Sequence, residues 1–184
     1  CLLLPRHGLA QDRAPLVRDV LGPILRRLVD PVFQNPGTGF IEGQDRGGCV
    51  FLTFTPEPCD YGRIIGRGGQ NFQTLKTLLE PVAWRDGKMV RFSILESRCP
   101  GARANPIPPD PTWNPAGIVA IIGDYMEAVG QPREAEAFQD AAGWRIMAAG
   151  RLKQSVADAL RRWVSIMAAS QGGRALFNDE RLAV

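Results

Sequence analysis

The chain has 184 residues, a hydrophobic fraction of 45% and a formal net charge of +3. This length fits one large or two small globular domains, and the apolar fraction is high enough for a packed core. The small net charge excludes a polybasic tail protein, so any affinity for nucleic acid has to come from a shaped groove with locally placed arginine and lysine.

Residues 1–13 are predicted to be a mobile N-terminal arm. The start Cys1-Leu2-Leu3-Leu4-Pro5 is too short for a signal peptide and lacks its basic start, and no apolar run approaches the length of a membrane span. We therefore expect a soluble, cytoplasmic protein that has no membrane partner.

The next segments predict a helix and two strands. Residues 14–32 carry apolar side chains at helical spacing, despite Pro23, and predict an amphipathic helix. A short extended piece near 38–42 and a hairpin-like loop at 45–48 follow. Residues 49–55 are rich in β-branched and aromatic side chains and predict a strand, because the prolines directly after it stop regular structure.

A short helix, a glycine turn, a longer helix and a strand are predicted next. Asp60 is interpreted as the N-cap of the short helix. Residues from about 70 to 80 predict the longer helix, and residues 89–95 alternate between apolar and polar side chains as a half-buried strand does. The apolar positions of the longer helix are Phe72, Leu75, Leu78, Leu79 and Val82.

Dense prolines at 98–115 predict a semi-rigid linker and a domain boundary. Beyond it, helical periodicity predicts a small all-α module at 116–170, followed by a C-terminal tail at 171–184. Three helices are expected in the module: one over 118–129 closed by Gly130, one starting near Pro132 with Phe138, Ala142 and Ile146 on one face, and one with Leu152, Val156, Leu160, Trp163 and Met167 on one face.

The helix over 118–129 has more apolar residues than one packing face needs, so another surface should cover the excess. The first half of the same chain, a second copy and a different protein are the three candidates. Basic residues of the last helix are interpreted as solvated surface, with a second RNA contact as the alternative; they are Arg151, Lys153, Arg161 and Arg162. Trp144 and Trp163 are predicted to be core residues, although a tryptophan can also stack on a base.

The run Gly62-Arg63-Ile64-Ile65-Gly66-Arg67-Gly68-Gly69-Gln70 carries the clearest functional signal. Glycines at both ends of a four-residue turn let a sugar-phosphate chain approach the peptide backbone, because no Cβ intervenes. Free N–H groups at the start of the following helix then face the phosphates, with the positive end of the helix dipole behind them. A plain tight turn is the alternative interpretation of these glycines.

Other glycine motifs do not fit this run. A P-loop ends in Gly-Lys-Ser or Gly-Lys-Thr, whereas Gly69 is followed by Gln70-Asn71. A dinucleotide fingerprint needs Gly-x-Gly-x-x-Gly directly after a strand, and the spacing of these glycines does not supply it.

Residues 14–97, with this element order and this glycine run, resemble a type II KH domain and in particular the small single-KH RNA-binding proteins of bacteria (the KhpA group). The resemblance implies a three-stranded sheet with three helices on one face, and single-stranded RNA in a groove beside the glycine loop. Gly68 departs from the family, which usually has a polar or charged residue there. The RNA-binding residues that we predict are Arg63, Ile64, Ile65, Gly66, Arg67, Gly68, Gly69, Gln70, Asn71, Gln73 and Lys76.

The sequence thus predicts an α+β protein: a type II KH domain and a helical module. Its predicted function is non-catalytic binding of short single-stranded RNA, with ribosomal or small regulatory RNA as candidates. The alternative is a KH-fold assembly or scaffold module with little RNA affinity. A protein partner or self-association is expected through the C-terminal helices.

An enzyme is the third hypothesis, and we predict that the chain is not one. His7 is the single histidine, and the cysteines at 1, 49, 59 and 99 contain no Cys-x-x-Cys pair, which argues against His-dependent triads and zinc. Cys49 and Cys59 are interpreted as small apolar fillers. Glu57 and Asp60 flank the glycine run and could form a carboxylate pair. We expect no cofactor and no metal.

Overall fold

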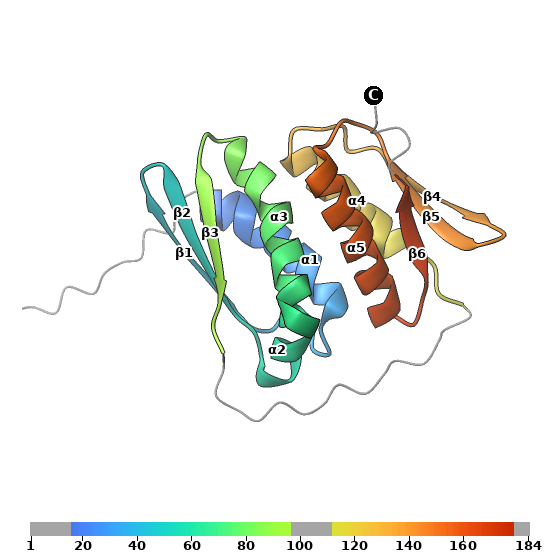
Figure 1. Ribbon diagram of the computed structural model, residues 1–184, viewed down its shortest axis with the longest axis horizontal. Coiled ribbons are helices and arrows are strands. Elements are labelled where there is room, and N and C mark those ends of the chain that lie inside the picture. The colour runs from blue at the N-terminus through green and yellow to red at the C-terminus, as the bar shows by residue number, and fades with distance from the viewer. Residues whose placement is uncertain (1–15, 97–111, 179–184) are drawn as a thin grey trace, which may run out of the picture.

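A computed structural model describes residues 16–96 and 112–178 of the chain. Two three-stranded sheets form the outer layers, and the long helices lie between them (Figure 1). The α+β class predicted from the sequence is confirmed. The predicted N-terminal arm at 1–13, residues 98–111 of the predicted linker and the end of the predicted tail lie outside the described residues.

The first half, residues 16–96, has the predicted element order of helix, two strands, short helix, glycine turn, long helix and strand. Leucines spaced three or four residues apart form the buried face of the first helix, where Leu21, Leu25 and Leu28 are fully buried. The elements are the π-helical turn η1 (Val17–Leu21), α1 (Gly22–Val29), the 3-10 turn η2 (Asp30–Val32), β1 (Phe40–Arg46), β2 (Cys49–Thr55), α2 (Pro58–Ile65), the 3-10 turn η3 (Arg67–Gly69), α3 (Gln70–Trp84) and β3 (Met89–Ile94).

Strand β2 is the centre of the first sheet. It pairs antiparallel with β1 across the two-residue turn Gly47-Gly48 and parallel with β3. Alternate side chains point to opposite faces of a strand, and Val50, Leu52 and Phe54 are fully buried on one side. Helices α1, α2 and α3 all lie on that side of the sheet (Figure 1).

The second half, residues 112–178, is not the predicted all-α module. Helices α4 (Ala116–Ala128) and α5 (Gln154–Ser170) match the first and third predicted helices. The second predicted helix is instead a hairpin of β4 (Ala135–Asp140) and β5 (Gly143–Ala148), and β6 (Ala175–Asn178) lies within the predicted tail. Strand β5 pairs antiparallel with β4 and parallel with β6, so a second three-stranded sheet forms.

The prediction of a helix near 132–146 was wrong because its evidence was local. A spacing of four residues between Phe138, Ala142 and Ile146 fits a helix, but in the hairpin Ala142 lies in the turn, Phe138 points outward and Ile146 is buried. The partner that stabilises β5 is β6, which lies after α5 in the chain, and strand propensity depends on such pairing. A visible signal was the sequence Gln139-Asp140-Ala141-Ala142-Gly143, which resembles Gln44-Asp45-Arg46-Gly47-Gly48 at the turn of the first hairpin.

The two halves repeat one topology. Each has a helix, an antiparallel strand pair, a helix and a last strand that joins the sheet parallel to the middle strand. They differ between the middle strand and the second long helix. Residues 56–69 in the first half hold α2 and the glycine turn, whereas residues 149–153 join β5 directly to α5. The second half therefore lacks the segment that carries the glycine run.

Helices of the two halves pack against each other in the middle of the molecule, α3 against α5 and α1 against α4. Two buried hydrogen bonds cross this interface, from Tyr125 to the main-chain oxygen of Leu78 and from Trp163 to that of Leu28. Three surfaces were candidates to cover the apolar excess of the helix at 118–129, which is α4. In the structure, the first half of the same chain covers α4. None of the helices within the two described ranges has the length and apolarity that crossing a membrane requires.

Candidate nucleic-acid interface

The glycine run forms a tight connection between the end of α2 and the start of α3. Gly66, Gly68 and Gly69 all have positive φ angles, of 70°, 61° and 77°. Residues with a Cβ rarely adopt this left-handed region, so the backbone itself requires glycine here. A Cβ at Gly68 or Gly69 would meet no other atom within 4 Å, so open space borders these two residues.

Asn71 fixes the shape of this connection from inside. Its side-chain amide nitrogen donates a hydrogen bond to the main-chain oxygen of Arg63 at 2.7 Å. A Cβ added to Gly66 would lie 2.5 Å from the Cγ of Asn71, so only glycine leaves room for this side chain. Asn71 was predicted as an RNA contact, and the structure places its side chain as a brace beneath the loop.

The outward side of the loop is polar and basic. Arg67, Gly68, Gln70 and Gln73 are exposed, and Lys76 is half-buried one turn further along α3. Helix α3 begins without a side-chain cap on its first N–H groups, which leaves the positive end of its dipole at the loop. Within residues 16–96 and 112–178, neither Arg67 nor Lys76 has a carboxylate partner. Their charges are therefore available to an anion.

Arg63 and Ile64, also predicted to contact RNA, point into the protein. Ile64 is fully buried in the core, so it cannot form the floor of a surface groove. The Arg63 side chain is 14% exposed, and its Nε lies 3.9 Å from the Oδ1 of Asp60. Its Nη1 donates a long hydrogen bond of 3.4 Å to the main-chain oxygen of Val32. These two residues support the loop from behind, while Ile65 is half-buried beside it.

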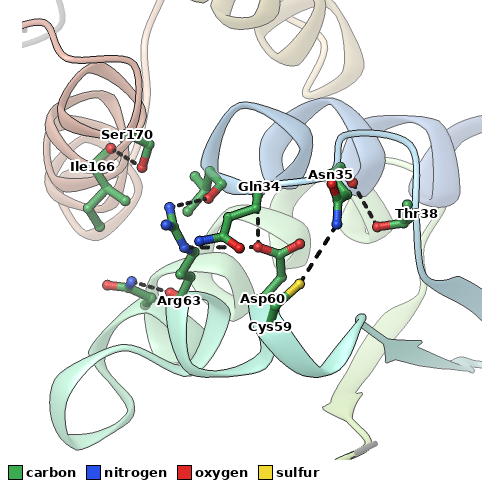
Figure 2. A network of polar contacts seen from close by, with 10 residues as sticks. Gln34, Asn35, Thr38, Cys59, Asp60, Arg63, Ile166 and Ser170 are labelled. Atoms are coloured by element: carbon green, nitrogen blue, oxygen red, sulfur yellow. Dashed lines mark hydrogen bonds and ion pairs between the residues drawn. The ribbon is translucent and has the colours of Figure 1, made fainter. Parts of the chain in front are cut away.

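The sequence predicted Asp60 as the N-cap of α2, and this prediction was wrong. Glu57 has the N-cap position, and Asp60 lies within the first turn of the helix and is fully buried. Its Oδ1 accepts a hydrogen bond of 2.8 Å from the main-chain N–H of Gln34 (Figure 2). The carboxylate therefore ties α2 to the segment after η2, which sits far from α2 in the sequence, and this tie fixes the position of the loop.

The half-buried Cys59 beside Asp60 is a free thiol. Partial burial and the negative charge of Asp60 raise the pKa of this thiol. A raised pKa keeps sulfur protonated, and the thiolate is the form that attacks substrates or binds metals. The arrangement therefore gives Cys59 no nucleophilic activation.

A groove with a volume of about 560 Å³ runs between α3 and the edge strand β3. Its helix side is formed by Lys76, Glu80 and Trp84, and its strand side by residues 89–92. Phe72 and Phe92 stack between the two elements with ring centroids 5.5 Å apart. Trp84 was missed by sequence reasoning, although it lies four residues after Glu80 and eight after Lys76, which is the spacing of one helix face.

Metal-ligating side chains do not gather in the described parts of the chain: no group of three histidine, cysteine or carboxylate residues comes close enough to hold an ion. Comparison of the chain with protein-family models, with curated proteins and with solved structures finds no significant match.

Proposed function

We propose that this chain is a non-catalytic RNA-binding protein that grips short single-stranded RNA at the connection between α2 and α3. The observation that carries the proposal is the outward side of this connection. Gly68 and Gly69 leave the backbone open to a close approach, Arg67 is exposed without an ion-pair partner among the described residues, and α3 starts there uncapped. Backbone N–H groups and a helix dipole at one point favour a phosphate.

We also propose that the first half is a type II KH domain. Its support is the order of helix, strand, strand, helix, glycine loop, helix and strand, together with an antiparallel pair β1–β2 and a parallel pair β2–β3. KH domains clamp four nucleotides of backbone with a Gly-x-x-Gly loop, which Gly66 to Gly69 would supply here. The half-buried Ile65 and the groove between α3 and β3 then offer an apolar floor for bases.

An RNA binder of this kind needs no cofactor, and the proposal places it in the cytoplasm. Single-stranded RNA fits better than a duplex, because unpaired bases can enter a groove and pair with the edge of a strand, whereas a duplex hides its base edges. The position of Asp60, which the sequence offered with Glu57 as a possible acid-base pair, supports a non-catalytic role. Asp60 is fully buried and bonded to Gln34, so it does not face a substrate.

A matched pair of variants tests the proposal, because the chain contains the tripeptide Arg-Gly-Gly twice, at 46–48 and at 67–69. Arg67→Asp with Gly68→Asp puts negative charge where the phosphate would lie. Arg46→Asp with Gly47→Asp makes the same change at the β1–β2 turn, at the other end of the sheet. Gly47 and Gly68 both have positive φ, and a Cβ at either would meet no other atom within 4 Å.

Binding of fluorescein-labelled tetrauridylate, which is short enough to occupy the glycine loop alone, is measured by fluorescence anisotropy at low salt, with circular dichroism as the check of folding. We expect the variant at 67 and 68 to lose roughly tenfold or more in affinity, and the variant at 46 and 47 to stay within about twofold of the wild type. Equal losses in the two variants would mean attraction by charge alone. An unchanged affinity in the folded variant at 67 and 68 would refute the proposed site.

Protein assembly remains the second candidate, and one surface favours it. On the outer face of the second sheet, Phe138 and Leu176 are 39% and 48% exposed on either side of Arg145. Large apolar side chains in one row on a sheet face are typical of protein contacts. Phe138→Ala with Leu176→Ala, compared by light scattering with the wild type, tests whether this row mediates self-association.

A further inference from the structure

We propose that the RNA site continues beyond the glycine loop, along α3 to Trp84, and that the second half of the chain contributes Lys153 to it. This inference rests on the proposed function, because it assigns the same strand of RNA to a longer path. The class of ligand is single-stranded RNA longer than the four nucleotides that a glycine loop clamps.

The groove between α3 and β3 provides this path. Gln73, Lys76, Glu80 and Trp84 follow one another along α3 at spacings of three or four residues, so they lie on one face of the helix. From Gln70 to Trp84 this face is about 21 Å long, which extends well past the first turn that a glycine loop needs. Opposite it lies β3, the edge strand of its sheet, whose outer backbone groups have no partner strand among residues 16–96 and 112–178.

Trp84 offers a surface on which a base can stack. It lies at the last position of α3, and 46% of its surface is exposed, although tryptophan is usually highly buried. The Lys153 ammonium lies 4.2 Å from the centroid of its ring, a cation–π contact that orients the indole and leaves a positive charge beside it. Any base can stack on an aromatic side chain, so this part of the site would bind RNA without preference for its sequence.

The charges along the groove suit a nucleic-acid backbone better than a peptide or a lipid tail. Lys76 and Arg91 line it, Lys153 stands at its end, and Glu80 is the one carboxylate among the residues that line it. The guanidinium of Arg91 also lies 5.8 Å from the ring centroid of Phe51, on the outer face of the sheet, so it borders the groove and that face together. Three cations against one carboxylate favour a polyanion.

The path also gives the second half a role. It lacks the α2 and glycine-loop segment, so it has no phosphate site of the same kind. Its helix α5 begins beside the end of α3, and Lys153, directly before α5, reaches Trp84 across the interface between the halves. The second half would thereby lengthen the RNA site of the first half.

The test compares labelled oligouridylates of four and eight nucleotides on the full chain. An octamer offers about five registers to a four-nucleotide site, so a fivefold gain is expected from counting alone. We expect the wild type to gain at least about tenfold beyond that, the fold-change to which about 1.4 kcal/mol of stacking corresponds. In Trp84→Ala the gain should fall by about tenfold, toward the counting factor, while tetramer affinity stays unchanged, and Trp84→Phe should keep most of it.

Two further variants sharpen the result. Lys153→Ala should lower octamer affinity and reduce its salt slope by about 0.7, without an effect on the tetramer. Phe138→Ala, an exposed aromatic residue on the other sheet, should change neither. A tetramer that binds as tightly as the octamer after the counting correction overturns this inference and leaves the glycine loop in place. The same holds if Trp84→Ala weakens both oligonucleotides equally. If neither binds, the proposed function fails, and the extended path with it.

Discussion

The phenol of Tyr125 donates a hydrogen bond of 2.9 Å to the main-chain oxygen of Leu78, and both groups are fully enclosed between the two halves of the chain. Tyr125 belongs to α4 and Leu78 to α3. A second bond of 3.0 Å runs from Trp163 of α5 to Leu28 of α1. In the repeat, α4 corresponds to α1 and α5 corresponds to α3, so the helix pair α4–α3 corresponds to the helix pair α1–α5. The two bonds therefore occupy corresponding places in a repeat, and they fix the register of the interface.

Tyr125→Phe should lower the free energy of unfolding by about 1 kcal/mol at neutral pH, because it removes one buried hydrogen bond. The cost should shrink above pH 10. Burial raises the pKa of the Tyr125 phenol above its ordinary value of 10.0, so the folded chain keeps a proton that the unfolded chain loses, and wild-type stability falls as the pH rises through 10. Urea unfolding at pH 7 and above pH 10 measures this; a difference independent of pH would contradict it.

Truncation after residue 97 should give a first half that self-associates or unfolds. The sequence predicted a KH domain at 14–97 that a linker separates from a helical module, but α1 and α3 are covered by α4 and α5, and truncation would expose that apolar surface. Since the second half has the topology of the first, a second copy of the first half could take its place. Light scattering measures the mass; a stable monomer would show that the interface is dispensable.

Gly66→Ala should destabilise the protein more than Gly68→Ala. Both residues have positive φ, with a backbone cost of about 1 kcal/mol for alanine at Gly68 and a larger one at Gly66, whose ψ of 175° belongs to a region that is essentially restricted to glycine. At Gly66 the new Cβ would also lie 2.5 Å from the Asn71 side chain, whereas at Gly68 it would meet nothing within 4 Å. We expect about 2–3 kcal/mol for Gly66→Ala. Denaturant midpoints measure both variants, and equal values would argue against the brace formed by Asn71.

Arg63→Ala and Arg67→Ala should affect different properties. Arg63→Ala leaves the fully buried Asp60 without its nearby cation and should cost about 3 kcal/mol of stability. Arg67 is exposed, so Arg67→Ala should change stability by less than about 0.5 kcal/mol and lower RNA affinity. Thermal unfolding and anisotropy titration are run on both variants. If the Arg63→Ala protein is as stable as the wild type but binds RNA more weakly, Arg63 contacts RNA, as the sequence predicted.

A hairpin duplex of the same length should bind more weakly than single-stranded RNA. In the proposed site the loop would contact the RNA backbone, whereas the groove between α3 and β3 would accept only bases that are free to turn out of a helix. Affinity for the single strand should also decrease gently with salt, since few cations line the site. Competition titration with unlabelled duplex and single strand measures the ratio. Equal or tighter duplex binding would argue against a groove.

The first half could be predicted almost completely because its signals are local. Residues 49–55 were predicted as a strand and are β2, and α3 starts at Gln70, where the glycines end. The candidate site was predicted less well. The sequence shows that Arg63 and Arg67 lie at the glycine loop. It does not show that the Arg63 side chain points toward Asp60 and Val32, whereas Arg67 is exposed to solvent. A side chain's direction depends on what packs behind it.

By itself, the sequence determined where the chain breaks and turns, and which residues are apolar at helix or strand spacing. Those properties are set by the residues themselves and their nearest neighbours along the chain. Only the tertiary structure decided that residues 135–148 form strands, because β5 is paired on its other side with β6, which follows α5 in the chain. It also decided that Trp84 and Lys153 meet, since that contact exists only where α3 and α5 pack together.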